Sequence, residues 1–270
     1  MNAVSLTAEF IDTAEGRLFV VERAPLDPRG GTTLLVSPLG DEMNKSRALF
    51  TQLGISLARE GRALIVVDLV GTGDSEGNFE DASIERWSKN LDALATWSSQ
   101  RGYAIDSIVA VRFGCLLAAH WARNTNRQFA STVFWQPVLN GAQIVSQWLR
   151  VRVAASMFDG NSKVTGAELE SELKEGRSLE IGGYPLTSSF ASELRSLDLT
   201  RLLCAGLGDL HLFEIGSGLE CSPAMSRLAQ TREFRQMSMI AGDAFWSATE
   251  IVQNPELIAR TVDALLCRKR

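Results

Sequence analysis

The turn most informative about the architecture reads Ser107-Ile108-Val109-Ala110-Val111-Arg112-Phe113-Gly114-Cys115-Leu116-Leu117-Ala118. Residues 107–111 form an apolar run, which predicts a short buried strand. Residues 113–123 are rich in alanine and leucine and predict a helix. Arg112 therefore stands at a sharp corner between a strand and the helix that follows it, with the small residues Ala110 and Gly114 on either side.

The same alternation of strand and helix extends in both directions from this corner. An N-terminal hairpin is predicted over 8–12 and 17–22, and further strands over 32–37, 63–68, 130–135, 210–215 and 234–240. Helices are predicted over 45–60, 84–100, 225–230 and 255–267, the first of them capped by Asn44. Strands that alternate with helices of ten residues or more indicate an α/β fold, a mostly parallel sheet with helices on both faces.

Residues 141–197 break this rhythm. They predict a helix over 141–158 with Ile144, Trp148, Val151, Ala155 and Phe158 on its apolar stripe, an acidic helix over 167–176, an extended piece over 179–185 and a helix over 188–197. The predicted organisation is a core formed by 1–140 and 198–270, with 141–197 inserted as a helical cap over the edge of the sheet.

Composition narrows the functional classes. The 270 residues are 45% hydrophobic and carry a net charge of −5, which argues against a nucleic-acid surface. No run of 18 apolar residues predicts a membrane span. The four cysteines are scattered without ligand spacing, so they indicate reduced thiols of a cytoplasmic protein, and neither a metal site nor a cofactor is predicted.

The corner at Arg112 is the turn that carries the nucleophile in α/β-hydrolases, where it reads G-x-S-x-G. We therefore expect an α/β-hydrolase-type fold in which arginine replaces the nucleophilic serine. A guanidinium stays protonated and cannot act as a nucleophile. At a helix N-terminus, it can either hold an anionic ligand or form a structural ion pair with an acidic neighbour.

The other catalytic positions of a hydrolase are also altered. Ala244 stands where the histidine base would follow the last strand, and Glu220 is the only acid after the preceding strand. His120 lies roughly 12 Å further along the helix from Arg112 and is expected to be a packed or surface residue, as is His211. Ser75 lies in a second G-x-S-x-G string, but no helix follows it directly, so it predicts a structural turn.

Ligands of parallel sheets bind beyond the carboxyl ends of the strands, and this rule selects the candidate site. The loop over 38–47 is dense in charge and offers Glu42 as the partner of Arg112. Asn44, besides capping its helix, stands in the same loop. Gln136 follows the neighbouring strand, and Trp246 and Glu250 lie after the last one. We take Arg112, Glu42, Asn44, Gln136 and Trp246 as candidate ligand-binding residues, with no catalytic residue assigned.

Several segments resemble those of the exosortase A system-associated hydrolase 2 family. They cover residues 38–47, 135–141, 148–152, 182–186 and 245–251, in the family's order, and the resemblance runs from about residue 7 to the end. It implies an α/β-hydrolase-like protein linked to bacterial exopolysaccharide production and envelope sorting, with arginine at the corner as a family feature.

Two functions follow from these observations. The first is a non-catalytic accessory protein of such a system, which binds an anionic or an acyl- or saccharide-related ligand or a protein partner of the exopolysaccharide machinery. The second is a hydrolase or acyltransferase with an unorthodox site, in which Arg112 clamps an anionic substrate and Glu42 or Asp68 acts as base. The absence of nucleophile and base favours the first.

Overall fold

The computed structural model describes residues 4–27, 30–157, 163–232 and 234–266, and an eight-stranded sheet runs through them. Hydrogen-bonded neighbours follow the order β1-β2-β4-β3-β5-β6-β9-β10, in which only β2 runs against the others. The strands are β1 (Val4–Ile11), β2 (Leu18–Pro25), β3 (Thr32–Val36), β4 (Ala63–Val67), β5 (Ile105–Val111), β6 (Ser131–Trp135), β9 (Asp209–Gly216) and β10 (Gln236–Ala241).

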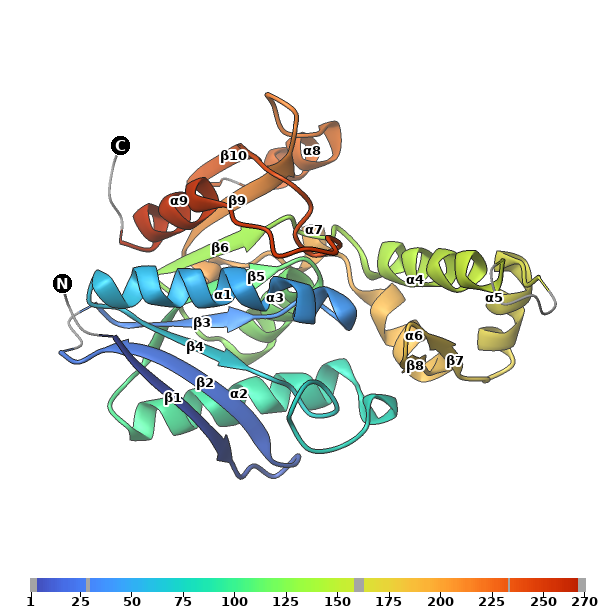
Figure 1. Ribbon diagram of the computed structural model, residues 1–270, viewed down its shortest axis with the longest axis horizontal. Helices are drawn as coiled ribbons and strands as arrows, with labels where there is room; N and C mark the ends of the chain where they lie inside the picture. The colour runs from blue at the N-terminus through green and yellow to red at the C-terminus, as the bar shows by residue number, and fades with distance from the viewer. Residues whose placement is uncertain (1–3, 28–29, 158–162, 233, 267–270) are drawn as a thin grey trace.

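Helices cover both faces of this sheet, as Figure 1 shows. The helices that pack on it or join its strands are α1 (Asp41–Arg59), α2 (Ile84–Gln100), α3 (Phe113–Thr125), α7 (Leu199–Leu202), α8 (Pro223–Thr231) and α9 (Pro255–Leu265), with short 3-10 turns η1 (Phe79–Asp81) and η2 (Ala205–Leu207). Helices α1 and α9 contribute to one buried cluster, whereas α2, α3 and α8 contribute to the other.

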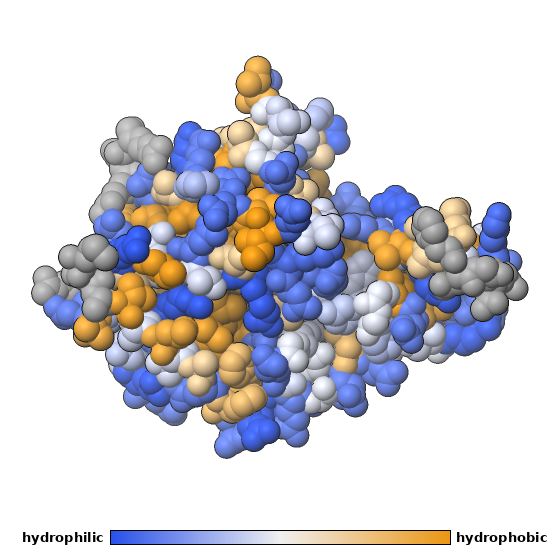
Figure 2. Space-filling view, viewed as in Figure 1, coloured by the Kyte–Doolittle hydropathy of each residue, from blue (hydrophilic) through white to orange (hydrophobic). Residues whose placement is uncertain are grey.

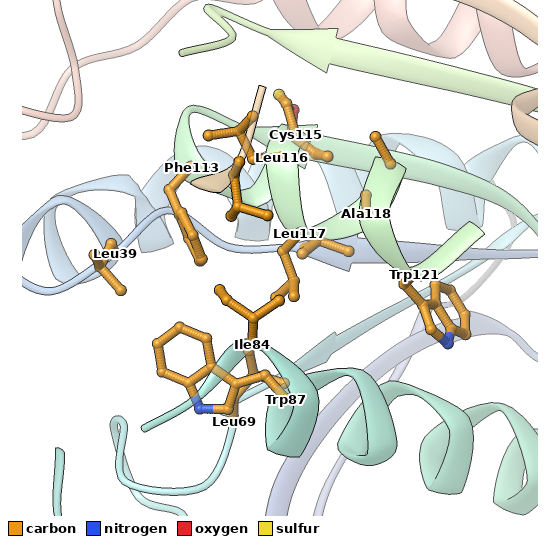
Figure 3. Packing of buried hydrophobic residues seen from close by; sticks show 14 of the residues in the cluster. Leu39, Leu69, Ile84, Trp87, Phe113, Cys115, Leu116, Leu117, Ala118 and Trp121 are labelled. Carbon is orange, nitrogen blue, oxygen red and sulfur yellow. The ribbon is translucent and has the colours of Figure 1, made fainter. Parts of the chain in front are cut away.

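The central strand β5 shows why its sequence lacks an apolar-polar alternation. Ile108 and Ala110 face the cluster under α2 and α3, and Val109 and Val111 face the cluster under α1 and α9. Successive side chains of a strand point to opposite faces, so a strand covered on both sides needs apolar residues throughout. Figure 3 shows the first cluster, in which α3 packs on α2, and the rings of Phe113 and Trp87 meet edge to face at 5.7 Å.

The described parts of the 141–197 segment (141–157 and 163–197), between β6 and α7, lie beyond the carboxyl ends of the strands (Figure 1). They contain α4 (Gly141–Ser156), α5 (Gly166–Lys174), the hairpin of β7 (Leu179–Ile181) and β8 (Tyr184–Leu186), and α6 (Ser188–Ser196). Phe79 of η1 holds this segment to the sheet domain, since its ring lies 5.9 Å from Trp148, 5.2 Å from Tyr184 and 5.8 Å from Phe190. An aromatic cluster therefore forms part of the contact between this segment and the rest of the chain.

Two local expectations are wrong. Helix α1 begins at Asp41 after Gly40, whose φ of 59° suits glycine, so Asn44 lies inside the helix and caps nothing. The buried stripe of α4 passes through Ile144, Val145 and Leu149, whereas Trp148 is half-buried and Val151 and Ala155 are exposed; the predicted Phe158 lies outside the described residues. The stripe is displaced because α4 packs on α6 as well as on the sheet domain.

The surface is mixed in character. On the face shown in Figure 2, hydrophobic side chains gather where α1 and α9 lie, and hydrophilic ones predominate between them and the 141–197 segment. Among the described residues, no helix has both the length and the apolar character that a membrane crossing requires.

Candidate functional site

Arg112 occupies a strained corner. Its backbone angles are φ 55° and ψ −116°, and it is one of three non-glycine residues with positive φ in the described part of the chain. Its N–H donates to the carbonyl of Trp135 at 3.0 Å, and a Cβ on Gly114 would come within 2.3 Å of the Val36 carbonyl oxygen. Tight packing on both sides therefore imposes a conformation that costs an L-residue about 1–3 kcal/mol. The geometry is that of a nucleophile elbow, with arginine at its apex.

The Arg112 guanidinium is paired with Glu42, as the sequence predicts. Nε donates to Oε2 of Glu42 at 3.2 Å and Nη2 to Oε1 at 3.0 Å, so the pair is bidentate. The Arg112 side chain is only 12% exposed and that of Glu42 20%. Glu42 lies in the first turn of α1, and its carboxylate faces the arginine at the apex of the elbow.

Two further elements hold the same guanidinium. Nη2 also donates to Oε1 of Gln147 on α4 at 3.3 Å, and the guanidinium carbon lies 4.9 Å from the centre of the Trp246 ring, in the loop after β10. Among the described residues, Nη1 makes no hydrogen bond. Arg112 is therefore fixed by an ion pair, a hydrogen bond to a neutral amide and a cation–π contact, from three separate parts of the chain.

No conventional base accompanies this corner. Ala244, Glu220 and Glu250 are exposed. His120 lies further along α3, with its Nε2 2.8 Å from the Nδ2 of Asn124, and His211 is buried within β9. Burial lowers the pKa of both histidines below their ordinary value, which suits packed neutral side chains.

Ser75 and Asp68 have structural partners. The Ser75 hydroxyl donates to the Asp68 carbonyl and accepts the N–H of Phe19 at 2.8 Å, which ties the loop after β4 to β2. The Asp68 carboxylate accepts from Nη2 of Arg47 at 3.0 and 2.9 Å and from the N–H of Asp74 at 3.0 Å. Ser75 and Asp68 are therefore both engaged in contacts that hold the loop, in agreement with the prediction of a structural turn.

Two of the five predicted site residues do not point at the ion pair. The side-chain oxygen of Gln136 accepts the N–H of Ile215 at 2.6 Å and so joins the ends of β6 and β9. Asn44 donates from Nδ2 to the hydroxyl of Tyr184 at 3.4 Å and joins α1 to β8. The structure therefore brings together Arg112, Glu42 and Trp246, with Asn44 one contact away through Tyr184.

A pocket of about 250 Å³ adjoins this site. Its lining comes from α1, α4, the β7–β8 hairpin and the loop after β10, and comprises Leu39, Asp41, Glu42, Lys45, Gln147, Trp148, Val151, Ile181, Gly182, Tyr184, Trp246 and Ser247. The sequence did not single out Gln147 or Tyr184 as site residues. The only available signal was that Trp148 and Tyr184 fall in segments with family resemblance. In the described part of the chain, no cluster of His, Cys, Asp and Glu could hold a metal ion.

Comparison with solved structures identifies the fold. Est1E from Butyrivibrio proteoclasticus with bound ferulic acid superposes with a TM-score of 0.62 at 14% identity, covering 96% of each chain. The thioesterase domain from the curacin biosynthetic pathway gives 0.61 at 12% identity over 97% of this chain and 99% of that one. A putative hydrolase from Agrobacterium vitis S4 gives 0.62 at 18% identity over 98% of each.

The chain thus has the α/β-hydrolase fold, with an eight-stranded, mostly parallel sheet and helices on both faces, as predicted from the corner at Arg112. No protein-family model matches the chain, and no curated protein matches it in sequence. The comparisons therefore show the fold alone, which this chain shares with a thioesterase domain and a putative hydrolase.

Proposed function

We propose that this chain is a non-catalytic small-molecule-binding protein built on the α/β-hydrolase fold. The observation that carries the proposal is the bidentate Arg112–Glu42 pair at the apex of the elbow. Acyl transfer needs a nucleophile, a base and a group that orients the base. Here the nucleophile position holds a cation and the base position an exposed alanine, Ala244.

The alternative, an unorthodox hydrolase or acyltransferase acting on an anionic substrate, needs Glu42 or Asp68 as base. Glu42 is committed to Arg112 and Asp68 to Arg47 through charge-assisted hydrogen bonds. Neither carboxylate can therefore accept a substrate proton without giving up hydrogen bonds from its guanidinium partner. The contacts therefore favour binding over catalysis.

The pocket beside the ion pair is the binding site in this proposal. Glu42 and Trp246 line it directly, and Arg112 holds both of them in place. Residues 141–197 act as its cap, since α4 and the β7–β8 hairpin supply half of the lining. Its volume suits a ligand smaller than a drug-sized molecule, and Est1E, which shares the fold, binds the small molecule ferulic acid.

The sequence resemblance described above supports a cellular context. We propose an accessory role in a bacterial exopolysaccharide or exosortase system, in the cytoplasm, with an acyl- or saccharide-related ligand or a protein of that machinery as partner. An anionic ligand would have to displace Glu42 from Arg112, and for this reason we favour the structural pair over anion binding for the guanidinium.

Hydrolysis assays test the proposal. The purified protein is offered short-chain p-nitrophenyl esters and thioesters beside Arg112→Ser, Ser75→Ala and Glu42→Gln variants. We expect no turnover above the buffer rate by the native chain. The Arg112→Ser variant should not become an efficient esterase, because no base is positioned for the new serine. Turnover that persists through purification and disappears in Ser75→Ala or Glu42→Gln would overturn the proposal.

A further inference from the structure

The charges around the 250 Å³ pocket cancel in pairs. Lys45 lies 2.9 Å from Asp41, and Arg112 lies 3.0 Å from Glu42. Asp41, Glu42 and Lys45 are the charged residues of the pocket lining, and Arg112 lies behind them. An anionic ligand would find no uncompensated cation, and a cationic ligand no uncompensated carboxylate. A charged ligand that left water for this site would lose its hydration without gaining an unpaired counter-charge.

The tryptophans of this pocket differ from those of the core in their hydrogen bonding. The indole N–H groups of Trp87, Trp121 and Trp135 donate to protein acceptors at 2.9, 3.0 and 2.9 Å. Those of Trp148 and Trp246 donate to no acceptor in the described part of the chain, and neither nitrogen is among the buried unpaired atoms. Both indole nitrogens thus keep some contact with solvent, although Trp246 as a residue is only 9% exposed.

Gln147 adds a third donor. Its Oε1 accepts from Nη2 of Arg112, which leaves its amide NH2 without an acceptor among the described residues. Arg112 therefore orients this amide. The half-buried glutamine lies in an otherwise largely apolar part of the lining, which comprises Leu39, Val151, Ile181 and Tyr184. Three residues of the lining thus carry a neutral N–H group that has no acceptor among the described residues.

We infer that the pocket binds a neutral, single-ring ligand that carries oxygen acceptors. The face of the ring packs on the apolar wall, and its oxygens accept from Trp148, Trp246 and Gln147. The volume admits one ring and its substituents, as pockets for larger ligands start at roughly 300 Å³. An aromatic ring with a carbonyl and a sugar ring share this chemistry. The inference rests on the proposed binding function and names the ligand class of the same site.

A matched pair of probes isolates the effect of charge. Benzamide and benzoate have the same shape, but only benzoate is an anion; methyl glucoside represents the sugar source and inorganic phosphate a pure anion. Binding is measured by calorimetry and by the shifts of the indole N–H signals in nuclear magnetic resonance, assigned with single Trp→Phe variants. The Trp148→Phe variant keeps a ring but loses the donor. Trp97→Phe is the control, because Trp97 is also half-buried and also donates to no described residue, yet does not line the pocket.

We expect benzamide or methyl glucoside to shift the signals of Trp148 and Trp246 and leave that of Trp97 unmoved, with benzoate and phosphate at least about five-fold weaker. Loss of one hydrogen bond in Trp148→Phe should weaken binding about five-fold, with no change in Trp97→Phe. Which neutral probe binds distinguishes the aromatic from the sugar source.

Tighter binding of benzoate or phosphate than of benzamide, or no shift with any probe at millimolar concentration, would overturn this ligand class. Either result with esterase activity still absent would leave the proposed non-catalytic function standing. Turnover of esters would overturn that function itself.

Discussion

The Arg112–Glu42 pair predicts a strong thermodynamic coupling between the two residues. Replacing Arg112 by methionine removes the cation and leaves the Glu42 carboxylate, 20% exposed, beside an apolar side chain. The two charge-assisted hydrogen bonds contribute about 2 kcal/mol net and the cation–π contact with Trp246 about 1 kcal/mol. Because water partly reaches Glu42, the expected loss of stability in Arg112→Met is about 3 kcal/mol, near the lower end of the range for a buried ion pair that loses one partner.

The double variant Arg112→Met with Glu42→Gln should cost about 3 kcal/mol, less than the sum of the two single losses, because no unpaired charge remains in it. Glu42→Gln alone should cost about 2 kcal/mol, which gives a coupling energy of about 2 kcal/mol. Urea unfolding followed by circular dichroism measures all four proteins. Single effects that add to within about 0.5 kcal/mol, or a loss below about 1 kcal/mol in Arg112→Met, would refute the reasoning that the pair holds the site.

Three further outcomes follow from the same contacts. Arg112→Gly should be about 1 kcal/mol more stable than Arg112→Met, because glycine adopts a φ of 55° without strain. Equal urea midpoints of the two variants would mean that the backbone at residue 112 is not strained. Phe79→Ala should destabilise the chain by about 3 kcal/mol and release the 141–197 segment to proteases, whereas an unchanged digestion pattern would show that its aromatic contacts do not anchor that segment. Burial lowers the pKa of His211 in the folded state, so its contribution to stability is complete above the unfolded pKa of about 6.5 and is lost as the pH falls through the folded pKa. The free energy of unfolding should therefore be smaller at about pH 5.5 than at about pH 7.5, and His211→Gln should reduce this difference. An equal difference in both proteins would contradict the prediction.

Most of the sheet domain was predictable because its strands are covered on both faces. The apolar runs ending at Val36, Val67, Val111 and Trp135 could only be buried parallel strands, and each was followed by a helical pattern. The helix start at Asp41 was not predictable in the same way, because Gly40 caps it through a positive φ, whereas Asn44 carries the stronger sequence signal for a cap.

The site was predictable only as far as the fold fixes it. The Arg112–Glu42 contact follows from the adjacency of the β3 loop and the elbow. Trp246 was expected in the crevice, and its loop brings it onto the guanidinium. Gln147 and Tyr184 come from α4 and the β7–β8 hairpin. The placement of these elements depends on the aromatic contacts of Phe79 and on the buried stripe of α4, which the sequence pattern predicted at other positions. The direction in which Gln136 points depends on a backbone with φ 45°, which sequence periodicity does not encode.

An arginine paired with a carboxylate stands at the apex of the elbow, so we expect no activated serine in this protein. Intact-protein mass spectrometry after exposure to a fluorophosphonate, which modifies activated serine nucleophiles, measures this property. The mass of the native chain should stay unchanged under conditions that fully label a serine esterase. A stoichiometric adduct that maps to Ser75, or to any other serine of the chain, would contradict this expectation.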